Sequence, residues 1–223
     1  MTQALRKLVT FDEFVAKYPD NSGKRYELHD GVVIEMSQPT GEHEEVIGFL
    51  ALNISIEIGR LKLPYFIPKT ALVKPLESES AYLPDVLVLN RPNLVNEPLW
   101  KKDSTVSLAK SIPLVIEVVS TAVATTGGTP ATHCLTNWRD DYLTKVAAYE
   151  AVGIPEYWIV DYAALGGRRF IGNPKQPTIS VYSLVDGEYQ INQFCESERI
   201  ISPTFRELNL TAEQIFQAGG VQI

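Results

Sequence analysis

The chain has 223 residues, of which 45% are hydrophobic and 21% charged, and its formal net charge is −7. These totals predict one folded domain over residues 1–223 and exclude a disordered tail. The negative balance argues against proteins that coat nucleic acid with a broad positive surface, but it is compatible with a local basic groove.

Neither a targeting segment nor a membrane span is expected. The N-terminal sequence MTQALRKLVTFDEF is interrupted by charges, and no apolar run approaches the length needed to cross a bilayer. Cys134 and Cys195 have no metal-type spacing, which predicts two free thiols in a reducing compartment. We therefore expect a cytoplasmic protein without a membrane partner.

The N-terminal part of the chain predicts a helix, a hairpin and a second, longer helix. Thr10 can cap a short helix in TFDEFVAKYP. Asp30-Gly31 stands between two strand-like runs, which is a strong hairpin signal. Apolar residues then recur at helical intervals from about Glu42 to Arg60.

Three apolar runs follow and predict strands at residues 65–75, 81–90 and 111–120. The next segment, TAVATTGGTPATHCL, is small, polar and interrupted by Gly and Pro. It predicts a long surface loop at about residues 121–136. A loop of this length is uncommon inside a folded domain unless it has a function.

The C-terminal part predicts a helix that ends at Gly153, a buried strand in IPEYWIVDY, a hairpin across Asp186-Gly187 and a small helix capped by Thr211. Because a helix connects SIPLVIEVVS to IPEYWIVDY, these two strands are expected to be parallel. The predicted fold class is α/β (α+β), with a mixed central β-sheet flanked by helices, an N-terminal hairpin and a C-terminal β-hairpin.

Three charged residues interrupt apolar sequence and carry the predicted chemistry. Asp85 stands in YLPDVLVLN, Glu117 in SIPLVIEVVS and Lys145 in the next helix. A buried carboxylate is costly unless it is paired or binds a metal. Two carboxylates on neighbouring strands can share Mg²⁺ or Mn²⁺, which keep several waters and need few protein ligands. With a nearby ammonium, they predict a site for phosphodiester hydrolysis.

Five segments, taken in order, resemble the Uma2-like (DUF820) branch of the PD-(D/E)XK nuclease superfamily, in particular its cyanobacterial members. The segments are RYELHDG, GEHEEVI, YLPDVLVL, PLVIEVVS and DDYLTKVAAYEAVGIPEYWIVD. The resemblance implies a restriction-endonuclease-like core at about residues 25–162 and the activity of a metal-dependent endonuclease.

In this resemblance, Pro84-Asp85 matches the PD element and Glu117 matches the acid of the second element. The lysine of that element is replaced by Val119, and Lys145 on the following helix is its implied counterpart. The link from Glu117 to Lys145 is longer than is usual in the family, which we attribute to an insertion in the predicted loop.

Four further groups belong to the implied site. Glu27 and His43 match two polar positions upstream of the PD element, where Glu27 would orient the water or the lysine and His43 would lie near the substrate. The Val118 carbonyl is a candidate third metal ligand beside the two carboxylates. Asp141 is a candidate accessory residue that holds the lysine or a second metal.

Each of these residues also has a purely structural interpretation. Asp85 can end a turn, Glu117 can belong to a buried ion pair, and His43 can be a capping residue. Lys145 can be a helix-surface lysine paired with Asp141 at i, i+4, and acids in a first turn are favoured by the helix dipole.

The remaining conspicuous side chains have simpler expectations. His29 and His133 are expected to be solvated, whereas Tyr157 and Trp158 are expected in the core of the last parallel strand. No His/Cys cluster indicates zinc, and no serine–histidine spacing or phosphate-binding glycine motif is present in the sequence.

The leading hypothesis from the sequence is a Mg²⁺- or Mn²⁺-dependent endonuclease that acts on DNA, with Lys145 stabilising the transition-state charge. Homodimers are common in the superfamily and would suit cleavage of both strands. Two other functions stay open, namely a catalytically silent module of the same fold that binds nucleic acid or protein, and a hydrolase of small phosphoesters.

Overall fold

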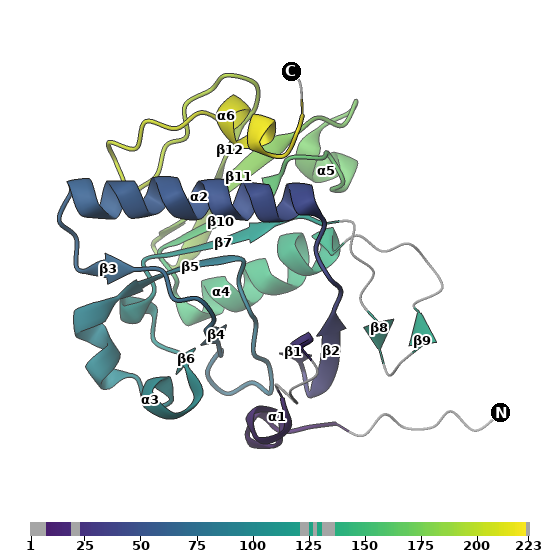
Figure 1. Ribbon diagram of the computed structural model, residues 1–223, viewed down its shortest axis with the longest axis vertical. Coiled ribbons are helices and arrows are strands. Elements are labelled where there is room, and N and C mark those ends of the chain that lie inside the picture. The colour runs from purple at the N-terminus through teal and green to yellow at the C-terminus, as the bar shows by residue number, and fades with distance from the viewer. Residues whose placement is uncertain (1–7, 19–22, 121–124, 127–128, 131–136, 222–223) are drawn as a thin grey trace.

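The computed structural model describes residues 8–18, 23–120, 125–126, 129–130 and 137–221. Its centre is a sheet with the strand order β12-β11-β10-β7-β5-β3 (Figure 1). The six strands are β3 (Tyr65–Phe66), β5 (Val86–Asn90), β7 (Leu114–Val118), β10 (Glu156–Asp161), β11 (Thr178–Val185) and β12 (Glu188–Phe194). Strands β7 and β10 run parallel, and the remaining four pairs of neighbouring strands are antiparallel. The prediction of a mixed sheet is therefore confirmed.

Helices cover both faces of this sheet (Figure 1). On one face, α2 (Gly41–Arg60) and α6 (Ala212–Ala218) pack on a core that includes Ile116. On the other face, a second core of aromatic and aliphatic side chains, which includes Val115 and Tyr157, packs against α4 (Val146–Val152). Because strand residues alternate between the two faces, Glu117 points to the α4 side. The predicted helices on both sides of a central sheet are therefore confirmed.

The predicted N-terminal hairpin is also confirmed and belongs to a second, smaller sheet with the order β1-β2-β8-β9. The hairpin consists of β1 (Arg25–His29) and β2 (Val32–Met36), and both turn residues, Asp30 and Gly31, have positive φ. The other two strands are β8 (Thr125–Thr126) and β9 (Thr129–Pro130).

The loop predicted at 121–136 is wrong in its described part, because Thr125 pairs with Glu35 of the hairpin. A two-residue strand leaves no recognisable alternation in the sequence, which explains the error. The rest of this segment, with His133 and Cys134, lies outside the described residues.

The single strand predicted at 65–75 is wrong. Its start, β3, pairs with β5, whereas its end, β4 (Leu72–Val73), pairs with β6 (Thr105–Val106) in a separate parallel pair. Pro68 interrupts the run and cannot donate to a strand ladder.

The predicted strand at 81–90 is shorter than expected, and this positions a site residue. Ala81 and Tyr82 form isolated bridges, and the regular strand β5 begins only after Pro84 and Asp85. Proline has no backbone donor, which fits this delayed start. Asp85 therefore lies immediately before the point where β5 joins β7.

The predicted helices are mostly confirmed. α1 (Phe11–Lys17) has a capping box of Thr10 and Glu13, α6 has one at Thr211, and α4 ends at Gly153 in the left-handed conformation. The structure adds short helices that have no strong sequence signal. They are η1 (Arg91–Asn96), α3 (Trp100–Asp103), η2 (Ala109–Ser111) and α5 (Arg168–Ile171).

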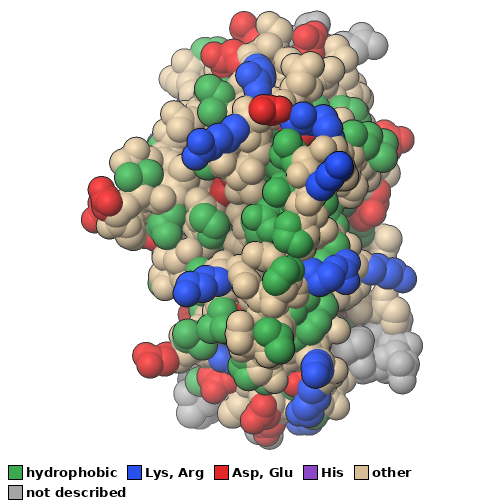
Figure 2. Space-filling model, turned by 90° about the vertical axis from the view of Figure 1, so that its left-hand side faces the viewer, with side chains coloured by type: hydrophobic (Ala, Val, Ile, Leu, Met, Phe, Trp, Pro, Cys, Tyr) green, Lys and Arg blue, Asp and Glu red, His purple; other side chains and the backbone are tan. Residues whose placement is uncertain are grey.

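Several basic side chains lie at the β3 edge of the sheet, together with acidic ones (Figure 2). Figure 2 shows that face with hydrophobic side chains along its middle and Lys and Arg side chains on both sides of them. The segments at this edge contribute the exposed Lys62, Lys69, Arg91 and Lys101, and the Arg91 guanidinium lies 4.4 Å from the ring centroid of Phe66.

Two further sequence predictions concern the whole chain. None of the helices in the described ranges is both long and apolar enough to cross a membrane. Cys195 has a free thiol, as predicted, and it lies beside Thr178 at the sheet edge.

Substitution by alanine is predicted to have opposite effects on stability at two glycines, Gly48 within α2 and Gly153 at the end of α4. Gly48→Ala in the exposed middle of α2 should stabilise the protein by about 0.5–1 kcal/mol, because no atom lies within 4 Å of the added methyl group and alanine favours helix. Gly153→Ala should destabilise it by about 1 kcal/mol, because φ is +84° there and the nearest atom, 3.7 Å away, allows the methyl group. Urea denaturation of both variants measures this, and equal signs would contradict it.

Candidate active site

Asp85 and Glu117 lie side by side on neighbouring strands. Strands β5 and β7 pair with Val86 opposite Ile116, so the register continued by one residue sets Asp85 opposite Glu117. Opposed residues of antiparallel strands point to the same face, with Cβ atoms about 5 Å apart. Both side chains line one pocket, together with Glu27, His43 and Lys145. The structure therefore gathers in one place all four residues predicted to be catalytic.

The Asp85 side chain, instead of a neighbouring strand, pairs with the backbone at the end of β7. Its Oδ2 atom accepts a hydrogen bond of 2.8 Å from the Val118 backbone N–H, at the point where β5 has not yet begun. The Val118 carbonyl accepts a 3.0 Å hydrogen bond from His43 Nε2, and this nitrogen lies 3.6 Å from Asp85 Oδ2. His43 stands in the first turn of α2, whose N-cap is Thr40. Burial lowers the pKa of His43, but Asp85 and the carbonyl raise it more.

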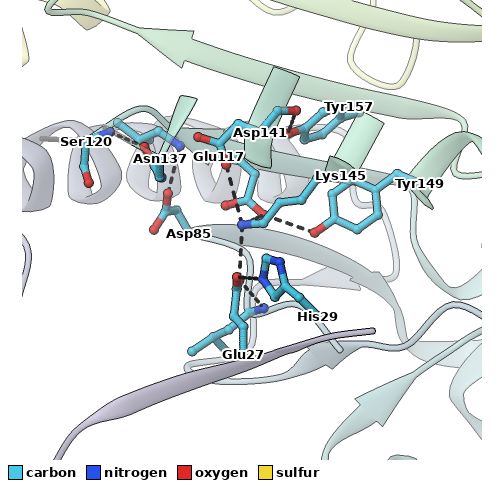
Figure 3. Close-up of polar contacts among 12 residues, drawn as sticks. Glu27, His29, Asp85, Glu117, Ser120, Asn137, Asp141, Lys145, Tyr149 and Tyr157 are labelled. Atoms are coloured by element: carbon cyan, nitrogen blue, oxygen red, sulfur yellow. Dashed lines mark hydrogen bonds and ion pairs between the residues drawn. The ribbon is translucent and has the colours of Figure 1, made fainter. Parts of the chain in front are cut away.

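Lys145 is buried among three carboxylates that come from three different elements (Figure 3). Its Nζ lies 2.9 Å from Glu117 Oε1, 3.1 Å from Glu27 Oε1 and 3.6 Å from Asp141 Oδ1. Burial opposes the charged form, yet the carboxylates around it hold the pKa of Lys145 well above its usual value. The interpretation as a helix-surface lysine is wrong, because the residue is 2% exposed.

Glu27 is the most strongly anionic of these carboxylates. Besides Lys145, it accepts hydrogen bonds from the Leu83 backbone N–H at 2.9 Å and from His29 Nε2 at 2.8 Å. Although burial raises its pKa, Lys145 and His29 together with the Leu83 N–H lower it to about 2. The expectation of a solvated His29 is wrong, since the side chain is 15% exposed and anchored to Glu27.

Glu117 has the opposite electrostatic environment. Burial raises its pKa to about 8, and Asp85 and Glu27 add to this increase, although Lys145 lowers it. The Tyr149 hydroxyl donates a 3.1 Å hydrogen bond to Oε1 of Glu117. The Tyr149 ring contacts Tyr82 and Tyr157 edge to face, with centroids 5.8 Å and 5.0 Å away. This aromatic packing fixes the hydroxyl that orients Glu117.

Asp141 precedes Lys145 in a π-helical stretch, Asp140–Lys145, which leads into α4. The sequence predicted a regular α-helix here, and that detail is wrong; π-helical turns are rare and often occur at functional sites. Among the described residues, no group donates a hydrogen bond to either carboxylate oxygen of Asp141. Burial is the main cause that raises its pKa well above the usual value. Asp141 therefore lies beside the lysine, at the position that the predicted accessory role calls for.

The chemistry of this donor set fits a small divalent cation. The contacts of Lys145 and Tyr149 both end on Oε1 of Glu117, and those of Val118 and His43 end on Oδ2 of Asp85. As far as the described residues show, each carboxylate therefore keeps one oxygen for a ligand from the pocket, and the Val118 carbonyl has a second lone pair. In the described part of the chain no three His, Cys, Asp or Glu side chains form a metal cage. Two carboxylates with waters suit Mg²⁺ better than Zn²⁺.

The charges of the site also favour a cation. Four carboxylates, Glu27, Asp85, Glu117 and Asp141, surround one buried ammonium, and Asp85 and Glu27 raise the pKa values of Glu117 and Asp141. An excess of buried negative charge is costly; without a metal, a proton on Glu117 relieves it, and a divalent cation would replace that proton. This imbalance distinguishes the site from a simple buried ion pair.

Sequence reasoning did not identify three residues that hold the site together. Tyr149 lies four positions after Lys145, so helical spacing could have indicated that both face β7. His29 lies two positions after Glu27 on the same strand face, which is an equally simple signal. Asn137, whose Oδ1 accepts a hydrogen bond from the Ser120 N–H, has no such signal. Tyr157 and Trp158 are buried core residues, as predicted.

Comparison with known proteins agrees with this architecture. The chain is similar in structure to the crystal structure of a "putative nuclease belonging to DUF820" from Anabaena variabilis, with a TM-score of 0.65 and 16% sequence identity. The alignment covers 95% of this chain and 99% of the other. The chain therefore shares the fold of that protein.

A comparison of the sequence with family profiles identifies the family. The profile of the Uma2 family, described as "Putative restriction endonuclease", matches residues 11–213. The chain belongs to the Uma2 family, as its sequence motifs predicted. A search of curated proteins gave no match.

Replacing the buried ammonium predicts a pH-dependent loss of stability. Lys145→Met should lower the free energy of unfolding by about 3–5 kcal/mol at pH 8, because it leaves buried carboxylates without their counter-charge. The pKa values of Glu27, Glu117 and Asp141 would rise, since Lys145 lowers all three. A raised carboxylate pKa stabilises the fold at low pH and loses this effect as pH rises through it.

The deficit of Lys145→Met should therefore shrink as pH falls from 8 to about 4.5. Urea denaturation of wild type and variant in EDTA at several pH values measures this difference. A deficit that is equal at both ends of the range would contradict the proposed coupling. Lys110→Met, at an exposed position of η2, is the matched control and should show no such trend.

Proposed function

We propose that the protein is a Mg²⁺-dependent endonuclease that hydrolyses phosphodiester bonds of DNA. The observation that carries this proposal is the pair of carboxylates, Asp85 and Glu117, which face one pocket with a buried lysine beside them. The family description and the fold of the Anabaena variabilis protein support it.

Asp85, Glu117 and the Val118 carbonyl would hold the cation. When bound, Mg²⁺ would polarise a phosphoryl oxygen and lower the pKa of a coordinated water. Lys145 would stabilise the negative charge that develops on the phosphate, because its ammonium stays protonated in this acidic surrounding. Glu27 holds Lys145 from the hairpin side and fixes the position of the ammonium.

The same geometry argues against the alternative function of a catalytically silent module. A lysine that served only structure would need one buried carboxylate partner, whereas this one lies within 4 Å of three. A fourth carboxylate, Asp85, lies at the pocket and raises the pKa of Glu117. Such a set costs folding energy unless a ligand uses it.

Substitution of one ligand tests the proposal. Glu117→Gln keeps the size and the Tyr149 contact but removes the negative charge, so Mg²⁺-dependent cleavage of supercoiled plasmid should fall at least about 100-fold. Glu188→Gln, at an exposed residue of β12, is the matched control and should cleave like wild type. Gel electrophoresis of the plasmid gives both rates.

Equal cleavage by wild type and Glu117→Gln would indicate a contaminating nuclease and overturn the proposal. The products add information on assembly. A homodimer, which we also propose, should convert supercoiled plasmid directly to linear DNA, whereas a monomer should accumulate nicked circles.

The pKa of Glu117 predicts how cation binding depends on pH. Because this pKa is raised to about 8, the carboxyl group is mostly protonated at pH 7 in the absence of metal, and binding must release a proton. Mg²⁺ affinity should increase up to about tenfold per pH unit between pH 6 and 8 and then level off. Calorimetric titration in two buffers of different ionisation enthalpy measures the proton release. An affinity that is constant from pH 6 to 8 would contradict the assignment.

A further inference from the structure

We propose that a second cavity, beside the candidate active site, binds an unpaired nucleobase of the substrate strand. The inference rests on the proposed function and deepens it, because it names single-stranded or locally opened DNA as the substrate class. The cavity lies between α1, the start of β1, β4 and the end of α3. We call it the aromatic cavity, after Phe14, Tyr18 and Tyr26, which line it.

The aromatic cavity adjoins the pocket that holds Asp85 and Glu117. Arg25 and Leu83 line both, so the two share a wall. Leu83 also donates its backbone N–H to Glu27, which contacts Lys145. In this proposal, a DNA strand with its scissile phosphate at Lys145 would run past Arg25, which lines both cavities, and bring a neighbouring nucleotide to the aromatic cavity.

The rings of the cavity suit a base rather than a phosphate. The Tyr18 ring lies 4.6 Å from that of Tyr26 and 5.6 Å from that of Phe14, measured between centroids. Aromatic side chains bind single-stranded nucleic acid by stacking on bases, and this contact tolerates any sequence because every base has a π face. The volume of about 410 Å³ lies in the range of sites for small molecules.

Basic side chains surround the same cavity and match the charge of a nucleotide. Lys24, Arg25 and Lys102 line it. The Lys102 side chain is 79% exposed and lies 3.6 Å from Asp103, which also lines the cavity, and Lys24 contacts Glu35 at 2.8 Å. An ammonium that shares one carboxylate keeps further donors for a phosphate. Aromatic walls with a basic rim, next to a phosphodiester site, fit a nucleotide better than an apolar peptide side chain.

A base inside a duplex cannot enter such a cavity. Entry requires that the base be unpaired or rotated out of the stack, at a cost of a few kcal/mol for a paired base. The aromatic cavity therefore predicts a preference for single strands, mismatches or ends over intact duplex.

The experiment measures binding and cleavage separately on the full chain. Fluorescence anisotropy in EDTA gives the Kd of a labelled 12-nucleotide oligodeoxythymidine and of a duplex of the same length. The variants are Tyr18→Leu, which removes the ring, Tyr18→Phe, which keeps it, and Lys102→Ala. Lys110→Ala, on exposed η2 outside the aromatic cavity, is the matched control for lysine. Thermal unfolding shows whether each variant folds.

Wild type should bind the single strand more tightly than the duplex. Tyr18→Leu should weaken single-strand binding about tenfold, and Tyr18→Phe should stay within about twofold of wild type. Lys102→Ala should reduce the slope of log Kd against log salt by about 0.7, while Lys110→Ala should not. Because Lys102 is exposed, its variant tests the proposal even if Tyr18→Leu unfolds.

If both Tyr18→Leu and Lys102→Ala bind the single strand as tightly as wild type, the proposal of a base site in the aromatic cavity is overturned. Equal affinity for single strand and duplex would also overturn it. If wild type cleaves plasmid with Mg²⁺ in either case, the proposed function stands without the base site. If wild type does not cleave but its single-strand binding depends on Tyr18, the base site is supported and the endonuclease proposal fails.

Discussion

The contacts of one buried ammonium determine the arrangement of this site. Lys145 joins the helix that carries it to β1 through Glu27 and to β7 through Glu117. A charge removed from water is tolerated only where close partners replace its hydration. The small hairpin sheet, the central sheet and the helix layer must therefore meet at this point, and the pocket is the space that remains beside their junction.

The same ammonium serves two carboxylates with opposite properties. Glu27 receives two further donors, His29 and the Leu83 N–H, and stays ionised. Glu117 receives only the weaker Tyr149 hydroxyl and faces Asp85, so its proton is retained more strongly. Environments that separate the pKa values of neighbouring carboxyl groups assign them different roles. In this site, Glu27 is suited to hold Lys145, and Glu117 is suited to exchange its proton for a cation.

The sequence predicted which residues meet in the site better than it predicted their surroundings, for physical reasons. Asp85 and Glu117 interrupt apolar strands, a pattern that stays visible because buried carboxylates are costly. Val119 lies two positions after Glu117 on the same strand face, and α4 packs on that face. Lys145, which directly precedes α4, therefore reaches Glu117 in place of a lysine at position 119. By contrast, the π-helical turn, the broken strand at 65–75 and the pairing of Thr125 depend on tertiary contacts, which local periodicity does not report.

Strand β1 connects the two cavities through the alternation of its side chains. Arg25 and Glu27 point to one face, where Glu27 reaches Lys145, while Tyr26 and Leu28 point to the other and pack with α1. A change in the position of β1 would therefore move Glu27 and Tyr26 together. If a base occupies the aromatic cavity, its contacts with Tyr26 and α1 would hold β1 against the sheet and keep Glu27 on Lys145. Substrate binding and the alignment of the ammonium would then depend on the same five-residue strand.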